Sequence, residues 1–360
     1  MNKQTLILVG SSSIHTTRYL EAVLDHFTEV VFISHNLASV DPQLLKRVTA
    51  YDFNFKLNNF ACRFQIAKLL SKYNPQTTII HIQQANSFAY HTLKAIKHTR
   101  LKFKTILTAW GSDVLVLPKR NLIFKNMVKF NLEQADIITS DSLYMSSVIR
   151  QLSAKVKHLY TINFGIKHCP HQVNLSAKEN IILSTRLHKE LYNIEEIILA
   201  YARYLNNNPQ SDYKLVVAGD GELTPKLEAL VKALNLGDRI QLVGMLGYAQ
   251  LVELLAKSKL FISIPKSDAT SLSVLEAMAY SCYPILSNLP ANLEWVIDKT
   301  NGSICQNLND LDKDIAMAIK YLDDPTKSEK LAKFNLDLIQ SKACFENNIE
   351  QFIKLYAEIA

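Results

Sequence analysis

The chain has 360 residues, of which 48% are hydrophobic and 20% charged, so it can build two ordinary globular cores. No apolar run reaches the roughly 20 residues of a membrane-spanning helix. The first apolar run stops at Gly10, which predicts a buried strand rather than a signal peptide. The cysteines lack metal-ligand or redox-motif spacing, and we expect reduced thiols in a cytoplasmic protein. They are Cys62, Cys169, Cys282, Cys305 and Cys344.

The net charge of +7 is unevenly distributed along the chain. Residues 1–166 contain 20 Lys and Arg against 9 Asp and Glu, whereas residues 167–360 contain 20 against 24. A basic half beside an acidic half suggests that one half faces an anionic surface or ligand. A solvated face on a lysine-rich protein explains the same asymmetry, and the sequence leaves both interpretations open.

Both halves alternate short β-branched runs with amphipathic helical patterns. The first half predicts strands at Thr5–Val9, Val30–Ser34, Thr78–Ile82, Thr105–Thr108 and Asp136–Ser140. Helical patterns lie between them, such as Thr17–Phe27 and Phe60–Tyr73. The second half predicts strands at Asn180–Ser184, Lys214–Ala218, Ile240–Val243, Leu260–Ile264 and Pro284–Ser287, with helices at Ile194–Leu205, Leu223–Leu234, Tyr248–Ala256 and Ser271–Ala279. Apolar strands separated by helices imply parallel sheets covered on both faces.

We therefore predict two doubly wound α/β domains that face a central cleft, with ligand loops at the strand carboxyl ends. The first spans residues 1–166. A linker over residues 167–179 leads to the second, at residues 180–344. Residues 345–360 form a C-terminal helix, which we expect to pack back on the first domain.

The run from Asp268 to Glu276 carries the functional argument. A predicted strand ends before a loop of small polar residues, and a helix begins near Ser271, where backbone N–H groups attract anions. Glu276 lies inside that otherwise apolar helix and needs a partner. It either accepts hydrogen bonds from a ligand's hydroxyls or pairs with a nearby cation.

This run resembles the donor-site signature of glycosyltransferase family 4, which has the GT-B fold. The signature has two acidic residues separated by seven others and ends in Leu-Glu-Ala-Met-Ala; Asp268 and Glu276 occupy the acidic positions. The chain departs from it in two ways, with Asp for the first Glu and Ala269-Thr270-Ser271 for the glycine loop. The resemblance implies that Glu276 holds the ribose and Asp268 the sugar. It also places Ala269, Thr270, Ser271 and Leu272 at the donor.

Other segments of the second half resemble the same family in the same order. Arg186 matches the arginine that contacts the donor diphosphate, which a guanidinium fork suits. The usual lysine is absent from its expected position, and Lys189 is the nearest candidate. The further donor-binding candidates are Gly219, Asp220 and Gly221 in a strand-end turn, and Gly244, Met245 and Leu246 in the loop that reads the base.

The first half resembles the family's acceptor domain more loosely. Ser12 lies in the small-residue loop after the first strand, where the family packs against donor phosphates. The acceptor-side candidates are His15, His81, Trp110 and Asp113. Trp110 stands where the family usually has histidine, and it either stacks on a sugar or fills the core.

The resemblance implies a retaining, metal-independent transfer of a hexose or N-acetylhexosamine from a nucleotide sugar, taken as UDP-linked. No cofactor or nucleic acid is expected, and the acceptor is a glycan or lipid-linked molecule of the bacterial cell surface. Basic residues beside apolar ones suit an anionic membrane at its cytoplasmic face. These are Lys94, Lys97, Arg100, Lys102, Lys104, Lys119, Arg120, Lys125 and Lys129. A catalytically silent sugar-nucleotide-binding partner and a GT-B epimerase stay open as alternatives.

Overall fold

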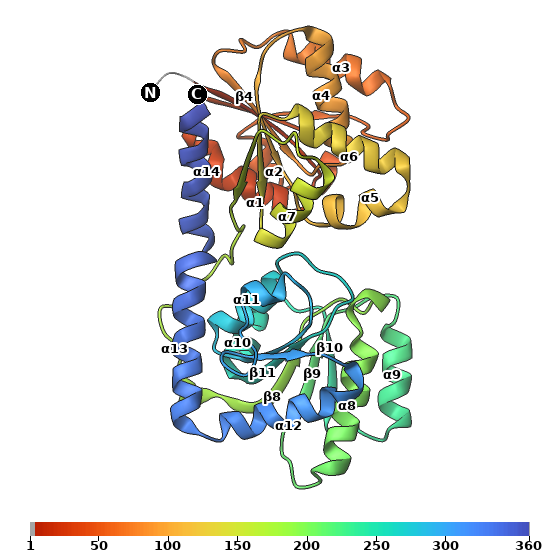
Figure 1. Ribbon diagram of the computed structural model, residues 1–360, viewed down its shortest axis with the longest axis vertical. Coiled ribbons are helices and arrows are strands. Elements are labelled where there is room, and N and C mark those ends of the chain that lie inside the picture. The colour runs from red at the N-terminus through yellow and green to blue at the C-terminus, as the bar shows by residue number, and fades with distance from the viewer. Residues whose placement is uncertain (1–3, 360) are drawn as a thin grey trace. The chain divides into compact units, whose positions relative to one another are not determined.

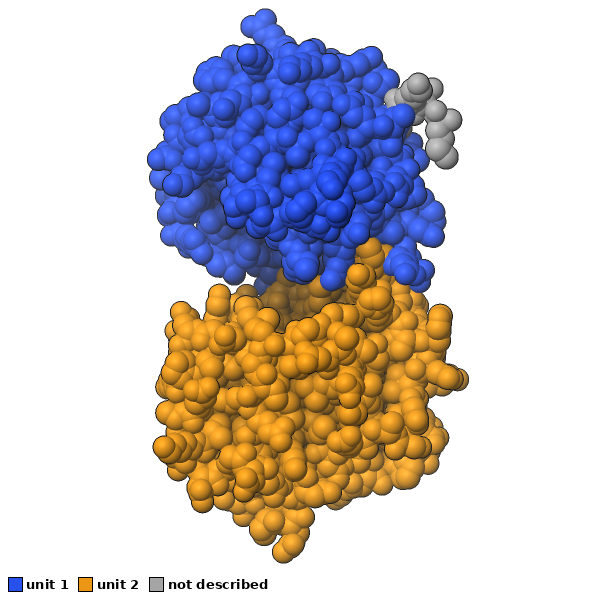
Figure 2. Space-filling model, turned by 180° about the vertical axis from the view of Figure 1, so that it is seen from behind, with its two compact units in different colours: residues 1–164, 346–360 blue, residues 165–345 orange. Residues whose placement is uncertain are grey.

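A computed structural model describes residues 4–359 of the chain (Figure 1). The chain divides into two compact units (Figure 2). Unit 1 comprises residues 1–164 together with 346–360, and unit 2 comprises residues 165–345. The segment over 167–179 therefore belongs to unit 2. No helix within residues 4–359 combines the length and hydropathy required to cross a membrane.

Unit 1 is built on a seven-stranded parallel sheet with the order β3-β2-β1-β4-β5-β6-β7. Its strands are β1 (Thr5–Val9), β2 (Glu29–Ser34), β3 (Thr49–Asp52), β4 (Thr78–Gln83), β5 (Lys104–Thr108), β6 (Ile137–Ser140) and β7 (His158–Thr161). Its helices are α1 (Ile14–Val23), α2 (Pro42–Leu45), α3 (Ala61–Leu70), α4 (Ser87–Thr99), α5 (Leu117–Arg120), α6 (Leu122–Gln134), α7 (Leu143–Leu152) and α14 (Phe345–Ile359).

Helix α14 belongs to unit 1 because its aromatic side chains are part of that unit's core. Tyr356 hydrogen-bonds Tyr19 of α1 at 2.9 Å and His81 Nδ1 of β4 at 2.5 Å. His81 Nε2 lies 2.7 Å from the Thr108 hydroxyl of β5. All four residues are buried. A polar network of this kind costs little only when its members bond one another, and these do.

Unit 2 is built on a six-stranded parallel sheet with the order β10-β9-β8-β11-β12-β13. Its strands are β8 (Glu179–Ser184), β9 (Lys214–Ala218), β10 (Ile240–Gly244), β11 (Ser258–Ser263), β12 (Tyr283–Ser287) and β13 (Ser303–Cys305). Its helices are α8 (Ile194–Asn207), α9 (Thr224–Ala233), α10 (Tyr248–Lys257), α11 (Leu272–Ala279), α12 (Leu311–Leu322) and α13 (Pro325–Lys342).

Both sheets reverse their strand order once, and the reversal determines where ligand loops meet. In unit 1 the strands that follow β1 in sequence are added on one side of it, and those that follow β4 on the opposite side. In unit 2, β8 and β11 occupy the same two positions. The loops that follow two such strands diverge to opposite sides of the sheet, so a crevice opens at their carboxyl ends. The loops after β8 and β11 carry Arg186 and Asp268, and those after β1 and β4 begin at Gly10 and Gln84.

Candidate active site

Arg186 and Asp268 meet at the strand-order reversal of unit 2. The Nη2 of Arg186 donates a hydrogen bond to Asp268 Oδ2 at 2.8 Å. The two side chains are only 11% and 17% exposed. Because solvent screens a partly buried pair less than a surface pair, this contact holds the guanidinium in a defined orientation.

Further contacts fix the rest of the Arg186 guanidinium. Its Nη1 donates to the hydroxyls of Ser271 and Ser273, the latter at 3.3 Å. The Tyr192 ring packs against the guanidinium, with 4.4 Å between the ring centroid and Cζ. Stacking on one face and hydrogen bonds along one edge leave Arg186 preorganised for an anionic ligand.

Asp268 lies in a poorly solvated position. Burial raises the pKa of its carboxyl, while Arg186 and the backbone N–H of Ala269 act in the opposite direction. The Ala269 N–H donates to Asp268 Oδ1 at 3.0 Å. A desolvated carboxylate is stabilised by each further hydrogen-bond donor, and a sugar hydroxyl is a suitable donor.

Helix α11 begins at this site without a side-chain cap. Ser271 is its N-cap residue, but the hydroxyl does not accept a hydrogen bond from the first turn. It accepts one from Arg186 instead. N–H groups at the start of a helix carry partial positive charge and need acceptors, which phosphate oxygens supply. Arg186 and the start of α11 therefore provide adjacent positive groups.

Glu276 lies further along the same helix and is half-buried. The pKa of Tyr280, one turn on, is raised first by burial and then by the charge of Glu276. The neighbouring Leu275 and Ala277 are fully buried, so Glu276 is a carboxylate in an apolar helix. Its partial exposure leaves it able to contact a ligand hydroxyl.

The glycine turn after β9 packs directly beneath the Arg186 loop. A Cβ at Gly219 would collide with the Arg186 carbonyl oxygen, and one at Gly221 would lie 2.5 Å from the His188 carbonyl oxygen. The His188 N–H donates to the Asp220 carbonyl at 3.0 Å. The Asp220 side chain accepts a hydrogen bond from Thr224 at 2.6 Å. The backbone of this turn contacts the backbone of the Arg186 loop. The Asp220 carboxylate stabilises the turn through its hydrogen bond with Thr224.

The predicted base-reading loop follows β10. Gly244 has a φ of +70°, and its carbonyl accepts a hydrogen bond from the Gly219 N–H at 2.8 Å. Met245 is 67% exposed. The loop is thereby tied to the glycine turn, while an apolar side chain stays open to a ligand.

Two lysines lie beside the position where the family lysine is missing. Lys189 is exposed, and its side chain makes no hydrogen bond or ion pair within residues 4–359. Lys266 was not predicted from the sequence. Its backbone N–H donates to the Leu191 carbonyl at 2.8 Å, and its Nζ lies 2.7 Å from Glu190. It comes from the end of β11, so only the sheet topology brings it to this position.

In unit 1, the structure brings His15 and Trp110 together after β1 and β5. Their ring centroids are 5.3 Å apart, and Phe164 lies 5.0 Å from Trp110. The Trp110 indole N–H donates to Gln83 at 2.8 Å. Burial, and then Arg18, lower the pKa of His15, so its imidazole favours the neutral form. Both rings are half-buried.

Three other predicted residues of unit 1 bond within the protein. Asp113 is buried and accepts hydrogen bonds from the backbone N–H groups of Ala85 and Trp110, at 2.6 and 3.1 Å. His81 has no exposed surface, so it cannot touch an acceptor in this structure. The Ser12 hydroxyl bonds the His35 carbonyl at 2.5 Å. Asp113 and His81 thus position loops and strands.

Comparisons with known proteins cover both units. The family model "Glycosyl transferases group 1" matches residues 169–335, and "Glycosyl transferase 4-like" matches residues 5–142. The protein belongs to glycosyltransferase family 4. This glycosyltransferase is 22% identical to N-acetyl-alpha-D-glucosaminyl L-malate synthase of Bacillus anthracis, with 98% of this chain and 94% of the relative covered.

A second relative and a solved structure are also similar to this chain. Alpha-monoglucosyldiacylglycerol synthase of Streptococcus pneumoniae is 24% identical, with 82% of this chain and 72% of the relative covered. The crystal structure of Anabaena HepE in complex with UDP aligns with a TM-score of 0.80 at 12% identity, over 99% of this chain and 100% of that one. The predicted GT-B fold is confirmed.

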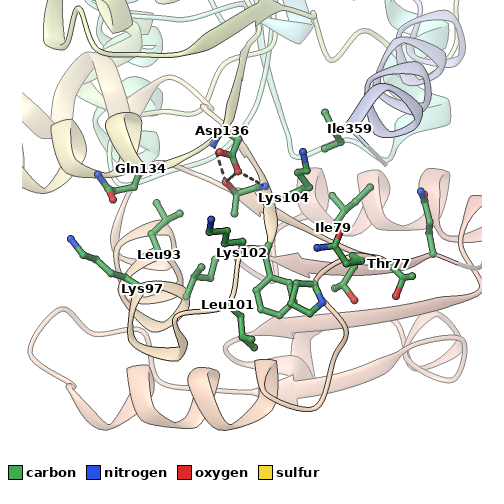
Figure 3. Close-up of a pocket in the computed structure, with 17 residues that line it drawn as sticks. Thr77, Ile79, Leu93, Lys97, Leu101, Lys102, Lys104, Gln134, Asp136 and Ile359 are labelled. Atoms are coloured by element: carbon green, nitrogen blue, oxygen red, sulfur yellow. Dashed lines mark hydrogen bonds between the residues drawn. The ribbon is translucent and has the colours of Figure 1, made fainter.

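The glycosyltransferase also has a pocket of about 640 Å³ at the amino ends of central strands of the unit 1 sheet (Figure 3). Residues at the starts of β4, β5 and β6 line it, together with Lys97, Lys102 and Ile359. Asp136 in this pocket accepts hydrogen bonds from Thr105 at 3.0 and 2.8 Å. Within unit 1 the pocket lies at the amino ends of these strands, whereas His15 and Trp110 follow the carboxyl ends of β1 and β5.

Proposed function

We propose that this glycosyltransferase is a retaining, metal-independent enzyme that uses a UDP-linked hexose or N-acetylhexosamine. The acceptor is a glycan or a lipid-linked molecule in bacterial cell-surface polysaccharide or glycoprotein assembly. The observation that carries the proposal is the Arg186 guanidinium, held by Asp268, two serines and Tyr192 beside the start of α11.

In the proposed complex the donor diphosphate lies on Arg186 and the first N–H groups of α11. Both are positive and preorganised, so they stabilise the charge that grows on the leaving diphosphate. Asp268 then accepts from hydroxyls of the transferred sugar and Glu276 from the ribose. These contacts hold the reacting carbon in place without forming a bond to it.

Asp268 is poorly suited to act as a free base because it is already paired with Arg186. We therefore propose that the departing phosphate oxygen takes the acceptor's proton. Attack then occurs on the face from which the diphosphate leaves, and the configuration is retained. Arg186, with Lys266 or Lys189 beside it, supplies the positive charge that a metal ion provides in other transferases.

The choice of UDP and of sugar rests on relatives. One relative is named for an N-acetylglucosaminyl product and another for a glucosyl product, and HepE was crystallised with UDP. In this chain the base would lie against the loop from Gly244 to Leu246. We assign the acceptor to unit 1, where His15 and Trp110 offer a neutral imidazole and an aromatic face.

A membrane-bound acceptor is supported by the α5–α6 segment. Leu122 and Ile123 at the start of α6 are 74% and 69% exposed. Lys119 and Arg120 precede them, and Lys125 follows one turn later. Exposed apolar side chains among cations suit the interface of an anionic bilayer. We propose that the enzyme binds the cytoplasmic face of the membrane through this segment.

The test is a transfer assay with UDP-, ADP- and GDP-linked glucose and N-acetylglucosamine, plus a bacterial lipid and glycan extract. We expect release of UDP that depends on the extract, persists in EDTA, and gives an α-linked product by NMR. Glu276→Gln should abolish transfer, whereas Glu253→Gln, an exposed glutamate of α10, should not. A β-linked product or loss of activity in EDTA would overturn the mechanism.

A further inference from the structure

The five cysteines fall into two groups by exposure. Cys62 and Cys282 have no exposed surface, and Cys305 is buried as well. Cys169 and Cys344 are partly exposed. They are 175 positions apart in sequence, yet they are neighbours in unit 2. The Gln340 side-chain amide, one turn before Cys344, donates to the Pro170 carbonyl at 2.8 Å, and Cys344 is close enough to Cys169 to raise the pKa of that thiol.

Backbone pairing brings the two cysteine segments together. The Ile166 N–H donates to the Ala343 carbonyl at 2.7 Å, and the Phe345 N–H donates to the Ile166 carbonyl at 3.0 Å. These bonds form a parallel bridge between Ile166 and Cys344. Gly165 fixes the approach, because a Cβ there would lie 2.7 Å from the Phe345 nitrogen and its φ is +82°. Cys169 follows three residues after the bridge.

The structure assigns Cys169 and Cys344 as an oxidation site at which the two thiols form an intrachain disulfide. The oxidant is a hydroperoxide such as hydrogen peroxide. One sulfur attacks the peroxide, which gives a sulfenic acid and releases water; the second sulfur attacks that sulfenic sulfur and releases a second water. Two thiols and one peroxide thus become one disulfide and two waters.

The environment favours an order for these two steps. Burial, and then Cys344, raise the pKa of Cys169 to about 12, so its thiolate is scarce near neutral pH. Cys169 is therefore a slow direct attacker of peroxide, and it suits the second, resolving step. Because the backbone bridge already holds the two segments side by side, the resolving step needs no large backbone movement.

The crosslink would join the two segments where the chain enters and leaves unit 2. The chain passes between the units at Phe164–Gly165 and again at Phe345–Glu346. A disulfide between residues 169 and 344 closes nearly all of unit 2 into one loop. Closing a long loop restricts the unfolded chain, so the oxidised form of unit 2 should unfold at higher temperature.

The test is peptide mapping of the full-length protein after hydrogen peroxide treatment, alkylation and digestion without reductant. We expect one crosslinked peptide pair containing Cys169 and Cys344, lighter by two hydrogen atoms and restored by dithiothreitol. Cys62, Cys282 and Cys305 should be alkylated only after unfolding. Sulfinic acid at Cys344 with no crosslinked pair, or a disulfide only between two molecules, would overturn the assignment.

A second readout uses the melting of unit 2. Trp295 is the only tryptophan in unit 2, so its fluorescence in a Trp110→Phe background reports that unit. Oxidation should raise its unfolding midpoint, and neither Cys169→Ser nor Cys344→Ser should show that rise. The reduced serine variants should melt like the reduced parent. An equal rise in both variants would contradict the assignment.

Discussion

Replacing Gly219 by alanine puts a methyl group against the backbone that carries Arg186. The added Cβ would collide with the Arg186 carbonyl oxygen and lie 3.1 Å from its carbonyl carbon. The φ of Gly219 is +143°, which side chains with a Cβ rarely adopt. Strain at such a φ costs about 1–3 kcal/mol, and forced overpacking costs about 1–3 kcal/mol more. We expect a loss of about 3 kcal/mol in the free energy of unfolding of unit 2.

Two other glycines separate these contributions. Gly244 has a φ of +70°, but a Cβ there would meet nothing within 4 Å, so its alanine variant should lose only about 1 kcal/mol. Gly237 has open space and no positive φ. Its alanine variant should be neutral or slightly stabilised, by up to about 1 kcal/mol. The expected order of destabilisation is Gly219, then Gly244, then Gly237.

Thermal unfolding followed by Trp295 fluorescence in the Trp110→Phe background measures the effect in unit 2 alone. A loss of about 3 kcal/mol should lower Tm by roughly 6–12 °C. Because relief of the collision displaces Arg186, nucleotide affinity should also fall, by roughly tenfold or more. If Gly219→Ala matched Gly237→Ala in Tm and in affinity, the idea that this turn supports Arg186 would be wrong.

Three other predictions follow from the structure. Burial lowers the pKa of His81 to about 3, so folded unit 1 keeps it neutral while the unfolded chain protonates it below about 6.5. The free energy of unfolding of unit 1 should therefore fall as pH decreases between these values, by up to roughly 5 kcal/mol. An equal fall in the His81→Gln variant, measured by denaturant titration, would refute this. Lys266→Ala should weaken nucleotide binding in calorimetry more than Lys189→Ala, and the reverse order would assign the second cation to Lys189. Replacing Leu122 and Ile123 by aspartate should reduce cosedimentation with anionic vesicles and spare transfer to a soluble acceptor; unchanged cosedimentation excludes this segment as the membrane contact.

The sequence predicts the central strands well because their apolar runs are long and buried on both faces. It misses β3, β7 and β13, which are the short edge strands. The ends of β3 and most of β7 are exposed, so these strands lack a continuous apolar run. Helices α4, α6, α7, α12 and α13 were not predicted individually either.

Candidate donor-site residues on one continuous run could be proposed from the sequence, since Asp268 and Glu276 share a loop and its helix. Residues recruited from elsewhere could not. Lys266 reaches Glu190 and Leu191 in the Arg186 loop only because β8 and β11 are neighbours in the sheet. Tyr192 lies just six residues after Arg186 in the same loop, but its stacking on the guanidinium depends on the conformation of that loop. His81 was expected on the acceptor side, but helix α14 covers it, and no local pattern around His81 reveals contact with residues near the end of the chain.

The central claim is that Arg186 holds the donor diphosphate, and calorimetric titration with UDP tests it most directly. Removing a guanidinium that makes two charge-assisted hydrogen bonds costs about 3 kcal/mol or more, which is roughly a hundredfold in Kd. Arg203→Ala is the matched control, because Arg203 also pairs with an aspartate, Asp312, but on α8 and α12. We predict that Arg186→Ala weakens UDP binding roughly a hundredfold while Arg203→Ala leaves it unchanged. Equal affinity of the Arg186→Ala variant and the parent protein would contradict the account.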